Sequence, residues 1–128
     1  LIELHDRSQF EVYAYSFGVN DKTSARARLE KAFDKFHDIR HLSEIEAAQL
    51  IHRDEIDILV DLTGFTQTSR SGIAALRPAP VNVNWLGFPG SMGSYNDVPL
   101  FDYILTDNFI SPPDSKNHYA EALLTLPN

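Results

Sequence analysis

The sequence predicts an α/β fold built on a parallel β-sheet, and two observations lead to this prediction. Strand-like and helix-like segments alternate along nearly the whole chain, which is typical of parallel strands joined by right-handed crossovers. Residues 56–62 are almost continuously apolar, which is the pattern of a central strand covered on both faces. With 128 residues, the chain is long enough for one such domain and too short for two, so we expect a single domain over residues 1–128.

The amino-terminal third predicts a strand followed by a helix. Residues 11–16 are rich in aromatic and β-branched side chains and end before Gly18, which is typical of a strand. Residues 38–42 contain one strong β-former and predict at most a short second strand. Residues 24–36 have a helical period, and their apolar stripe consists of Ala25, Leu29, Ala32, Phe33 and Phe36.

The clearest helix start in the chain lies at Ser43. Ser43 and Glu46 have the spacing of a capping box, in which each side chain bonds the backbone amide of the other residue. We therefore expect a helix that ends near residues 53–54. Its inward-facing residues are expected to be Ile45, Ala48 and Ile51.

The remaining segments continue the alternation after the apolar strand. Residues 69–76 predict a short helix, which ends before Pro78 because proline cannot continue it. Residues 81–86 and 103–106 predict strands. Residues 119–124 predict either a short helix or an edge strand, and the sequence leaves this choice open.

Composition and charge exclude several classes of function. No apolar segment is long enough to span a membrane. The formal net charge of −7 disfavours a nucleic-acid binder, which needs a basic face. The absence of cysteine excludes disulfides and thiolate metal sites, and it is compatible with a reducing compartment, so we expect a cytoplasmic protein. His37 and His41 lack a third ligand, so we expect surface or capping histidines and no metal site.

Three loops at the expected carboxyl ends of strands are the candidates for a ligand site. They are residues 16–18, residues 61–64 and the glycine-rich loop of residues 86–93. Open α/β sheets bind ligands at this edge, although a tight turn that only needs glycine remains an equal alternative. The spacing of Gly87, Gly90 and Gly93 fits neither the dinucleotide fingerprint nor a P-loop, which disfavours nicotinamide-dependent enzymes and nucleotide triphosphatases.

Three further polar or aromatic residues have a structural and a functional interpretation. Asp61 is expected to cap its turn rather than orient a ligand. Arg77 is expected to pair with an acid rather than bind a phosphate. Trp85 is expected to belong to the core rather than stack on a sugar or base.

Three runs of sequence together resemble the O-GlcNAc transferase and SPINDLY family, the family 41 glycosyltransferases. They are Asp57-Ile58-Leu59-Val60-Asp61-Leu62-Thr63-Gly64-Phe65-Thr66, Ala75-Leu76-Arg77-Pro78-Ala79-Pro80-Val81 and Trp85-Leu86-Gly87-Phe88-Pro89-Gly90. Residues 10–13 and 101–107 continue the similarity. The resemblance implies a Rossmann-like three-layer fold and a fragment of the amino-terminal lobe of a GT-B glycosyltransferase.

The resemblance also implies an activity for the longer protein. Members of this family transfer a sugar, here expected to be N-acetylglucosamine from UDP-GlcNAc, to serine or threonine of an acceptor protein, without a metal or cofactor. Tetratricopeptide repeats are expected upstream and a nucleotide-binding second lobe downstream. By this resemblance Leu86 and Gly87 contact the donor sugar, while Pro89 and Gly90 fix the path of the loop. No catalytic residue is expected within this chain, so the fragment alone is expected to be inactive.

The chain departs from the family pattern at two places, both expected to lie beside the sugar. Ser91-Met92-Gly93 replaces the usual Thr-Ser-Gly or Ser-Thr-Gly, and residues 94–100 form a longer connection than usual. These departures leave the donor open between N-acetylglucosamine and fucose. A non-catalytic α/β binding module and another GT-B sugar-nucleotide enzyme, such as an epimerase, remain the alternative functions.

Overall fold

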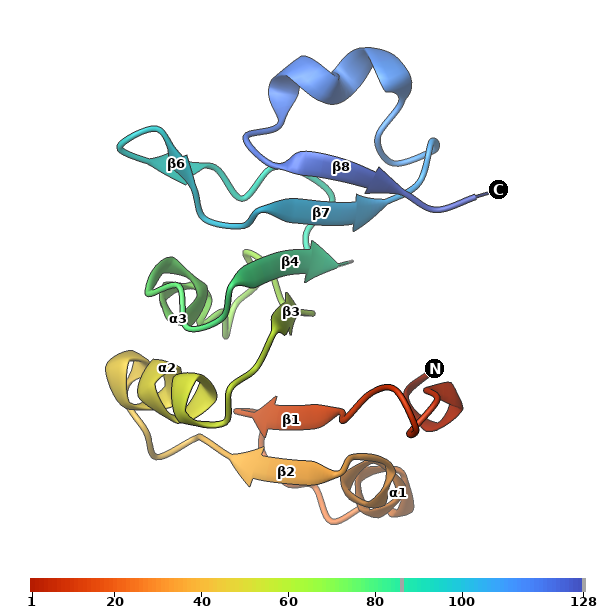
Figure 1. The fold of residues 1–128 in the computed structure, drawn as a ribbon, viewed down its shortest axis with the longest axis vertical. Coiled ribbons are helices and arrows are strands. Elements are labelled where there is room, and N and C mark those ends of the chain that lie inside the picture. The colour runs from red at the N-terminus through yellow and green to blue at the C-terminus, as the bar shows by residue number, and fades with distance from the viewer. Residues whose placement is uncertain (86, 128) are drawn as a thin grey trace. The chain divides into compact units, whose positions relative to one another are not determined.

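The computed structural model describes residues 1–85 and 87–127, and it has the mixed α/β fold with parallel strands that the sequence predicts. The chain forms two compact units, Leu1–Leu42 and Ser43–Asn128, and each unit has its own parallel sheet (Figure 1). Whether both units belong to one domain stays a prediction.

The first unit contains a two-stranded parallel sheet, with Tyr13 opposite Lys35. The Thr23 side chain caps its helix by accepting a hydrogen bond from the Arg26 backbone amide. The elements of this unit are η1 (Ile2–Leu4), β1 (Tyr13–Ser16), α1 (Ser24–Ala32) and β2 (Lys35–Asp38).

The predicted helix over residues 24–36 is four residues too long, because α1 ends at Ala32. The backbone becomes extended at Phe33, and β2 begins at Lys35, earlier than the predicted residues 38–42. The rings of Phe33 and Phe36 meet edge to face at 5.9 Å, and the Arg26 guanidinium lies 4.5 Å above the Phe36 ring. These aromatic residues pack from extended backbone rather than from a helical stripe.

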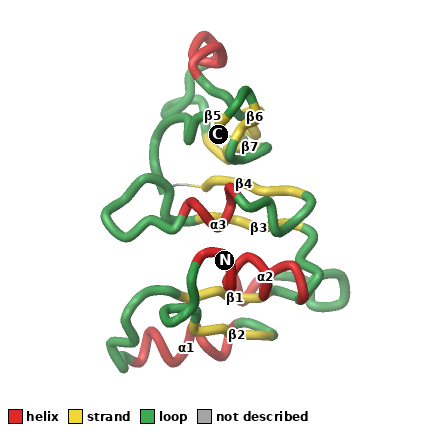
Figure 2. The backbone as a smooth tube through the Cα atoms, turned by 90° about the vertical axis from the view of Figure 1, so that its left-hand side faces the viewer, coloured by secondary structure: helices red, strands yellow, loops and turns green. Residues whose placement is uncertain are grey.

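The second unit is organised by a four-stranded parallel sheet in the order β3-β4-β7-β8. Every neighbouring pair of these strands is parallel, so all four carboxyl ends lie at one edge (Figure 1). Strands β3 and β4 run side by side, with α3 in the connection between them (Figure 2). The elements are α2 (Glu44–Arg53), β3 (Ile58–Asp61), α3 (Ser71–Ala75), β4 (Val81–Trp85), β5 (Ser94–Tyr95), β6 (Val98–Pro99), β7 (Tyr103–Thr106), η2 (Pro113–His118) and β8 (Ala122–Thr125).

Helix α2 confirms the predicted capping box, because Ser43 and Glu46 exchange both hydrogen bonds. The predicted inward position of Ile45 is wrong, since its side chain is 61% exposed. The buried residues are instead Ala47, Ala48 and Ile51. At about 100° per residue, Ile45 points more than 100° away from the centre of that buried face.

The prediction that residues 56–62 form a strand covered on both faces is wrong. Strand β3 lies at the end of the four-stranded sheet, and Ile58 and Val60 on one of its faces are 56% and 44% exposed. Residues 119–124, which the sequence left open, contribute the edge strand β8. A continuous apolar run therefore predicts the strand correctly but not its place in the sheet.

Residues 94–99 form a β-hairpin, β5–β6, that the sequence did not predict. Its turn residues Asn96 and Asp97 both have positive φ angles, 49° and 62°, as a type I′ hairpin turn requires. The hairpin lies near the amino end of β7, whereas the glycine-rich loop follows the carboxyl end of β4 (Figure 1). The hairpin follows the glycine-rich loop directly, and the Leu100 backbone amide donates a hydrogen bond to the Gly93 carbonyl oxygen at 3.0 Å. That this connection lies beside a sugar stays a prediction.

The amino ends of β4 and β7 are held together by the carboxylate of Asp102. Its Oδ1 accepts a hydrogen bond from Arg77 Nη2 at 2.7 Å, and its Oδ2 accepts one from the Asn82 backbone amide at 2.7 Å. The expectation that Arg77 pairs with an acid is confirmed. Burial raises the pKa of Asp102, but these two hydrogen bonds outweigh it and hold that pKa below its ordinary value.

We expect Asp102→Asn to lower the free energy of unfolding by about 1 kcal/mol at pH 7, because the pair is partly solvated. A lowered folded pKa stabilises the chain above the unfolded pKa of aspartate, about 3.9, and this contribution is lost as the pH falls through the folded value. Urea unfolding of the wild type and Asp102→Asn should therefore differ at neutral pH and converge below about pH 4.

The matched control is Asp114→Asn, since Asp114 is exposed on η2 of the same unit. Its unfolding curve should match the wild type at both pH values. An Asp102→Asn difference that does not change with pH would contradict the ion-pair account.

Candidate functional site

Two loops at the carboxyl edge of the four-stranded sheet form the candidate site. The loop after β3 is shaped by Asp61, whose carboxylate accepts hydrogen bonds from the backbone amides of Thr63 at 2.9 Å and Gly64 at 3.1 Å. The expectation that Asp61 caps its own turn is therefore confirmed. The second loop is the part of the glycine-rich segment that the structure describes, residues 87–93, which we call the glycine loop.

The two loops touch through their backbones, and neither has room for a side chain at the contact. A Cβ atom added to Gly64 would lie 2.7 Å from Phe88 Cβ and 2.8 Å from the carbonyl carbon of Gly87. A Cβ atom added to Gly87 would lie 2.6 Å from the Thr63 carbonyl oxygen. Gly64 also has a φ of +56°, which favours glycine independently of the contact. Glycine is therefore required at both positions.

The outer part of the glycine loop is apolar. The rings of Phe65 and Phe88 meet edge to face at 5.7 Å. A cavity of about 30 Å³ lies beside the loop, and it has room for a water molecule or two but not for a sugar ring. It is lined by Phe88, Pro89, Ile104, Leu105, Thr106 and Ile110.

The far end of the glycine loop is bound to Glu121, directly before β8. Glu121 Oε1 accepts a hydrogen bond from the Met92 backbone amide at 2.7 Å, and its Oε2 accepts one from Ser91 Oγ at 2.8 Å. The Met92 side chain is 2% exposed and packs with Ala74 and Phe101 in the core. The Met92 side chain therefore points into the protein, and the expectation that residues 91–93 lie beside a sugar stays a prediction.

The structure describes three of the four residues expected to contact or shape a sugar site. Gly87 and Gly90 are partly buried and Pro89 is exposed, all on the same loop. Leu86 lies outside the described residues. The assignment of Leu86, Gly87, Pro89 and Gly90 to a sugar site stays a prediction.

Polar groups of β4 approach the same edge, and the sequence analysis missed the asparagine among them. Asn84 is completely buried, and its Nδ2 lies 3.5 Å from Asp61 Oδ2. Within the part of the chain that the structure describes, Asn84 Oδ1 and Trp85 Nε1 are buried without a hydrogen-bond partner. The alternation of valine and asparagine in residues 81–84 was the available signal, because a period of two places Asn82 and Asn84 on one face. Glu121 had no comparable signal.

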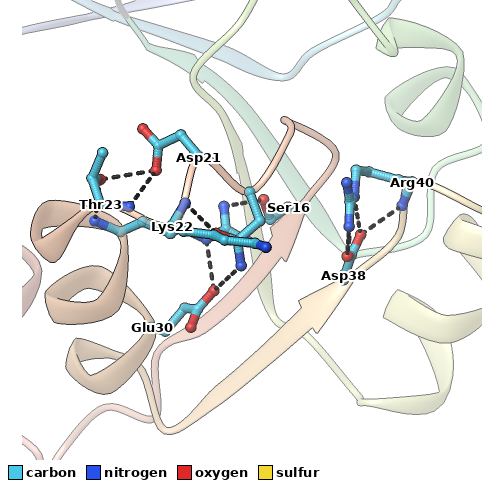
Figure 3. A network of polar contacts seen from close by, with 9 residues as sticks. Ser16, Asp21, Lys22, Thr23, Glu30, Asp38 and Arg40 are labelled. Carbon is cyan, nitrogen blue, oxygen red and sulfur yellow. Dashed lines mark hydrogen bonds and ion pairs between the residues drawn. The ribbon is translucent and has the colours of Figure 1, made fainter.

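The third candidate loop, residues 16–18, belongs to the first unit. Ser16 Oγ accepts a hydrogen bond from Arg26 Nη1 at 2.8 Å, and Arg26 Nε donates to Glu30 at 2.7 Å (Figure 3). At the end of β2, hydrogen bonds from Arg40 hold the pKa of Asp38 far below its ordinary value (Figure 3). These polar groups are bonded within the unit, so the loop presents an internal network.

The histidines and acids of the described residues form no candidate metal site. No group of three His, Cys, Asp or Glu side chains comes together in residues 1–85 and 87–127. His37, which was expected at the surface or at a cap, lies in β2 and stacks on Tyr15 at 5.2 Å. None of the helices in these same residues is long and apolar enough to cross a membrane.

Comparisons with known proteins agree on one family. The sequence profile of glycosyl transferase family 41 matches residues 1–128. The chain is 37% identical over 125 residues to the probable UDP-N-acetylglucosamine–peptide N-acetylglucosaminyltransferase SEC of Arabidopsis thaliana, and 39% identical over 126 residues to the corresponding transferase of Caenorhabditis elegans. Each match covers 98% of this chain but only 12% and 11% of the relative.

A solved structure also matches this chain over nearly its whole length. A mutant of the Thermobaculum terrenum O-GlcNAc transferase has a TM-score of 0.89 and 38% sequence identity, over 98% of this chain and 23% of that one. The chain therefore corresponds to a small part of the proteins that it resembles.

The contact between the two loops predicts a large difference between two glycine substitutions. Gly64→Ala places a Cβ atom against Phe88 at a positive φ, so we expect a loss of about 2 kcal/mol or more in the free energy of unfolding. Gly18→Ala is the matched control, because a Cβ atom there meets nothing within 4 Å, and we expect a change within about 0.5 kcal/mol. Urea unfolding measures both, and equal effects would contradict the contact.

Proposed function

The chain belongs to glycosyltransferase family 41, and we propose that it is part of an enzyme that transfers N-acetylglucosamine from UDP-GlcNAc to serine or threonine of acceptor proteins. The observation that carries the proposal is the family match over residues 1–128, which includes the glycine loop at the carboxyl edge of a parallel sheet. The relatives from Arabidopsis thaliana and Caenorhabditis elegans are named as UDP-N-acetylglucosamine–peptide transferases, which supports this donor and a peptide acceptor.

The proposed role of the glycine loop is to form the sugar-side wall of the donor site. Leu86 and Gly87 would contact the sugar, while Pro89 and Gly90 would fix the path of the loop. The backbone contact between Gly87 and Gly64 supports this role, because it holds the start of the described loop against the sheet edge. A rigid wall lowers the entropic cost of placing the anomeric carbon near an acceptor hydroxyl.

Stabilisation of the leaving group requires residues from elsewhere in the protein. Transfer releases a nucleotide diphosphate, and an enzyme must stabilise this growing negative charge with amides or cations. This chain has a net charge of −7, and Arg77 is paired with Asp102 at the amino edge of the sheet, opposite the glycine loop. We therefore assign leaving-group stabilisation to a second lobe and no catalytic residue to this chain, which alone would be inactive.

The proposal places both compact units in one Rossmann-like domain of the amino-terminal GT-B lobe, within a longer protein that carries tetratricopeptide repeats. The reaction needs no metal or cofactor in this proposal, and nucleic acid is not a partner. The cysteine-free sequence supports a cytoplasmic protein.

The experiment that tests the function is an assay of the full-length protein against a panel of nucleotide sugars. We expect UDP-GlcNAc to be consumed and N-acetylglucosamine to appear on serine or threonine of acceptor peptides, as read by mass spectrometry. Fucose on the peptides from GDP-fucose would correct the donor. Conversion of the nucleotide sugar without any modified peptide would indicate an enzyme such as an epimerase, and no reaction with any donor would indicate a binding module.

The position of Gly87 gives a specific prediction for the full-length enzyme. Gly87→Ala forces the glycine loop away from Thr63 and Gly64, so we expect kcat/KM for transfer to fall about 100-fold, as displacement of a positioning element can cause. Ala75→Val adds volume at an exposed position of α3 and should keep wild-type transfer. Wild-type kcat/KM in a folded Gly87→Ala enzyme would refute a role for the loop in the donor site.

A further inference from the structure

Glu121 is a buried carboxylate whose hydrogen-bond partners are neutral. It is 5% exposed, and among the described residues both of its partners belong to the glycine loop: Met92 N at 2.7 Å and Ser91 Oγ at 2.8 Å. A buried carboxylate without a cation is costly unless hydrogen bonds compensate for its lost hydration. For Glu121, which directly precedes β8, these hydrogen bonds come from a loop about 30 residues earlier in the chain.

The Ser91 hydroxyl uses all of its hydrogen-bonding capacity. It donates to Glu121 and accepts from the backbone amides of Gly93 at 3.0 Å and Ala120 at 3.1 Å. A hydroxyl has one donor and two acceptor positions, so its proton is directed at Glu121. The Met92 backbone amide is also a donor. The site therefore requires an acceptor at both oxygens of residue 121, which a carboxylate offers and an amide does not.

The glycine loop is consequently fixed at both ends of its described length. At one end Gly87 lies against the backbone of Thr63 and Gly64, and at the other end Glu121 binds Ser91 and Met92. The Met92 side chain, packed in the core, reinforces the second attachment. Pro89 is the exposed residue between the two attachments. The position of this middle section relative to the sheet therefore depends on both attachments.

We propose that Glu121 is a positioning residue for the donor sugar, acting through Ser91 and Met92 to hold the glycine loop in its sugar-binding conformation. This inference rests on the proposed function of the loop. Glu121 itself touches no substrate. Weakening its attachment lets the loop move away from the sugar, whereas the nucleotide, bound by the second lobe, is held as before.

The test uses the full-length enzyme and compares binding of UDP-GlcNAc with binding of UDP. Glu121→Gln keeps the size of the side chain but leaves one of the two loop donors without an acceptor. We expect the Kd and KM for UDP-GlcNAc to rise about tenfold, as the loss of one hydrogen bond to a charged group allows, with the Kd for UDP unchanged. Ser91→Ala should have the same effect, and Ser91→Thr, which keeps the hydroxyl, should recover most of the lost affinity.

A purely structural role gives a different result. If Glu121 only stabilises the fold, Glu121→Gln lowers the melting temperature while the ratio of the two Kd values stays at its wild-type value, and the proposal is overturned. Should Glu121→Gln fail to fold, the ratio in Ser91→Ala decides in the same way. Asp114→Asn, an exposed carboxylate-to-amide change in the same unit, is the control.

Gly87→Ala separates this inference from the proposed function. If Gly87→Ala weakens UDP-GlcNAc binding and Glu121→Gln does not, the loop contacts the sugar but Glu121 does not position it. If neither variant alters sugar binding, the donor site itself is assigned to the wrong loop.

Discussion

The backbones of two loops meet at the carboxyl edge of the sheet, and the arrangement of the candidate site depends on this contact. Gly64 and Gly87 approach so closely that neither can carry a Cβ atom, which ties the loop after β3 to the loop after β4. Asp61 holds the first loop in the required turn through the amides of Thr63 and Gly64. The glycine loop therefore lies directly on a rigid sheet edge, where parallel sheets place their ligands.

The two most distinctive motifs of the chain have different physical roles at opposite edges of the sheet. The Leu76–Pro80 motif lies at the amino edge, where Arg77 pairs with Asp102 and links β4 to β7. The Trp85–Gly90 motif leaves the carboxyl edge of β4. The first motif contributes an ion pair that links two strands, and the second leads into the glycine loop of the candidate site. Both motifs lie within residues 1–128, which match glycosyl transferase family 41, but only the second lies at the candidate site.

The sequence predicted the features that depend on local pattern and missed those that depend on distant partners. Strand and helix alternation, the Ser43–Glu46 capping box and the turn of Asp61 follow from residues close in the chain, and the structure has all three. The position of β3 at the end of its sheet depends on which strands pair, which an apolar run does not specify. The hydrogen bonds of Glu121 join residues 29 and 30 positions apart, and the Met92 side chain packs against Ala74 and Phe101, so no local period signals either contact.

The central claim is that the glycine loop forms the sugar-side wall of a donor site and is held there from both ends. Hydrogen–deuterium exchange of the full-length protein with saturating UDP-GlcNAc or saturating UDP tests it most directly, read on peptides that cover residues 87–93. The account predicts that these peptides exchange more slowly with UDP-GlcNAc than with UDP, because only the former carries the sugar that contacts the loop. Equal exchange with the two ligands, while both are bound, would contradict the claim.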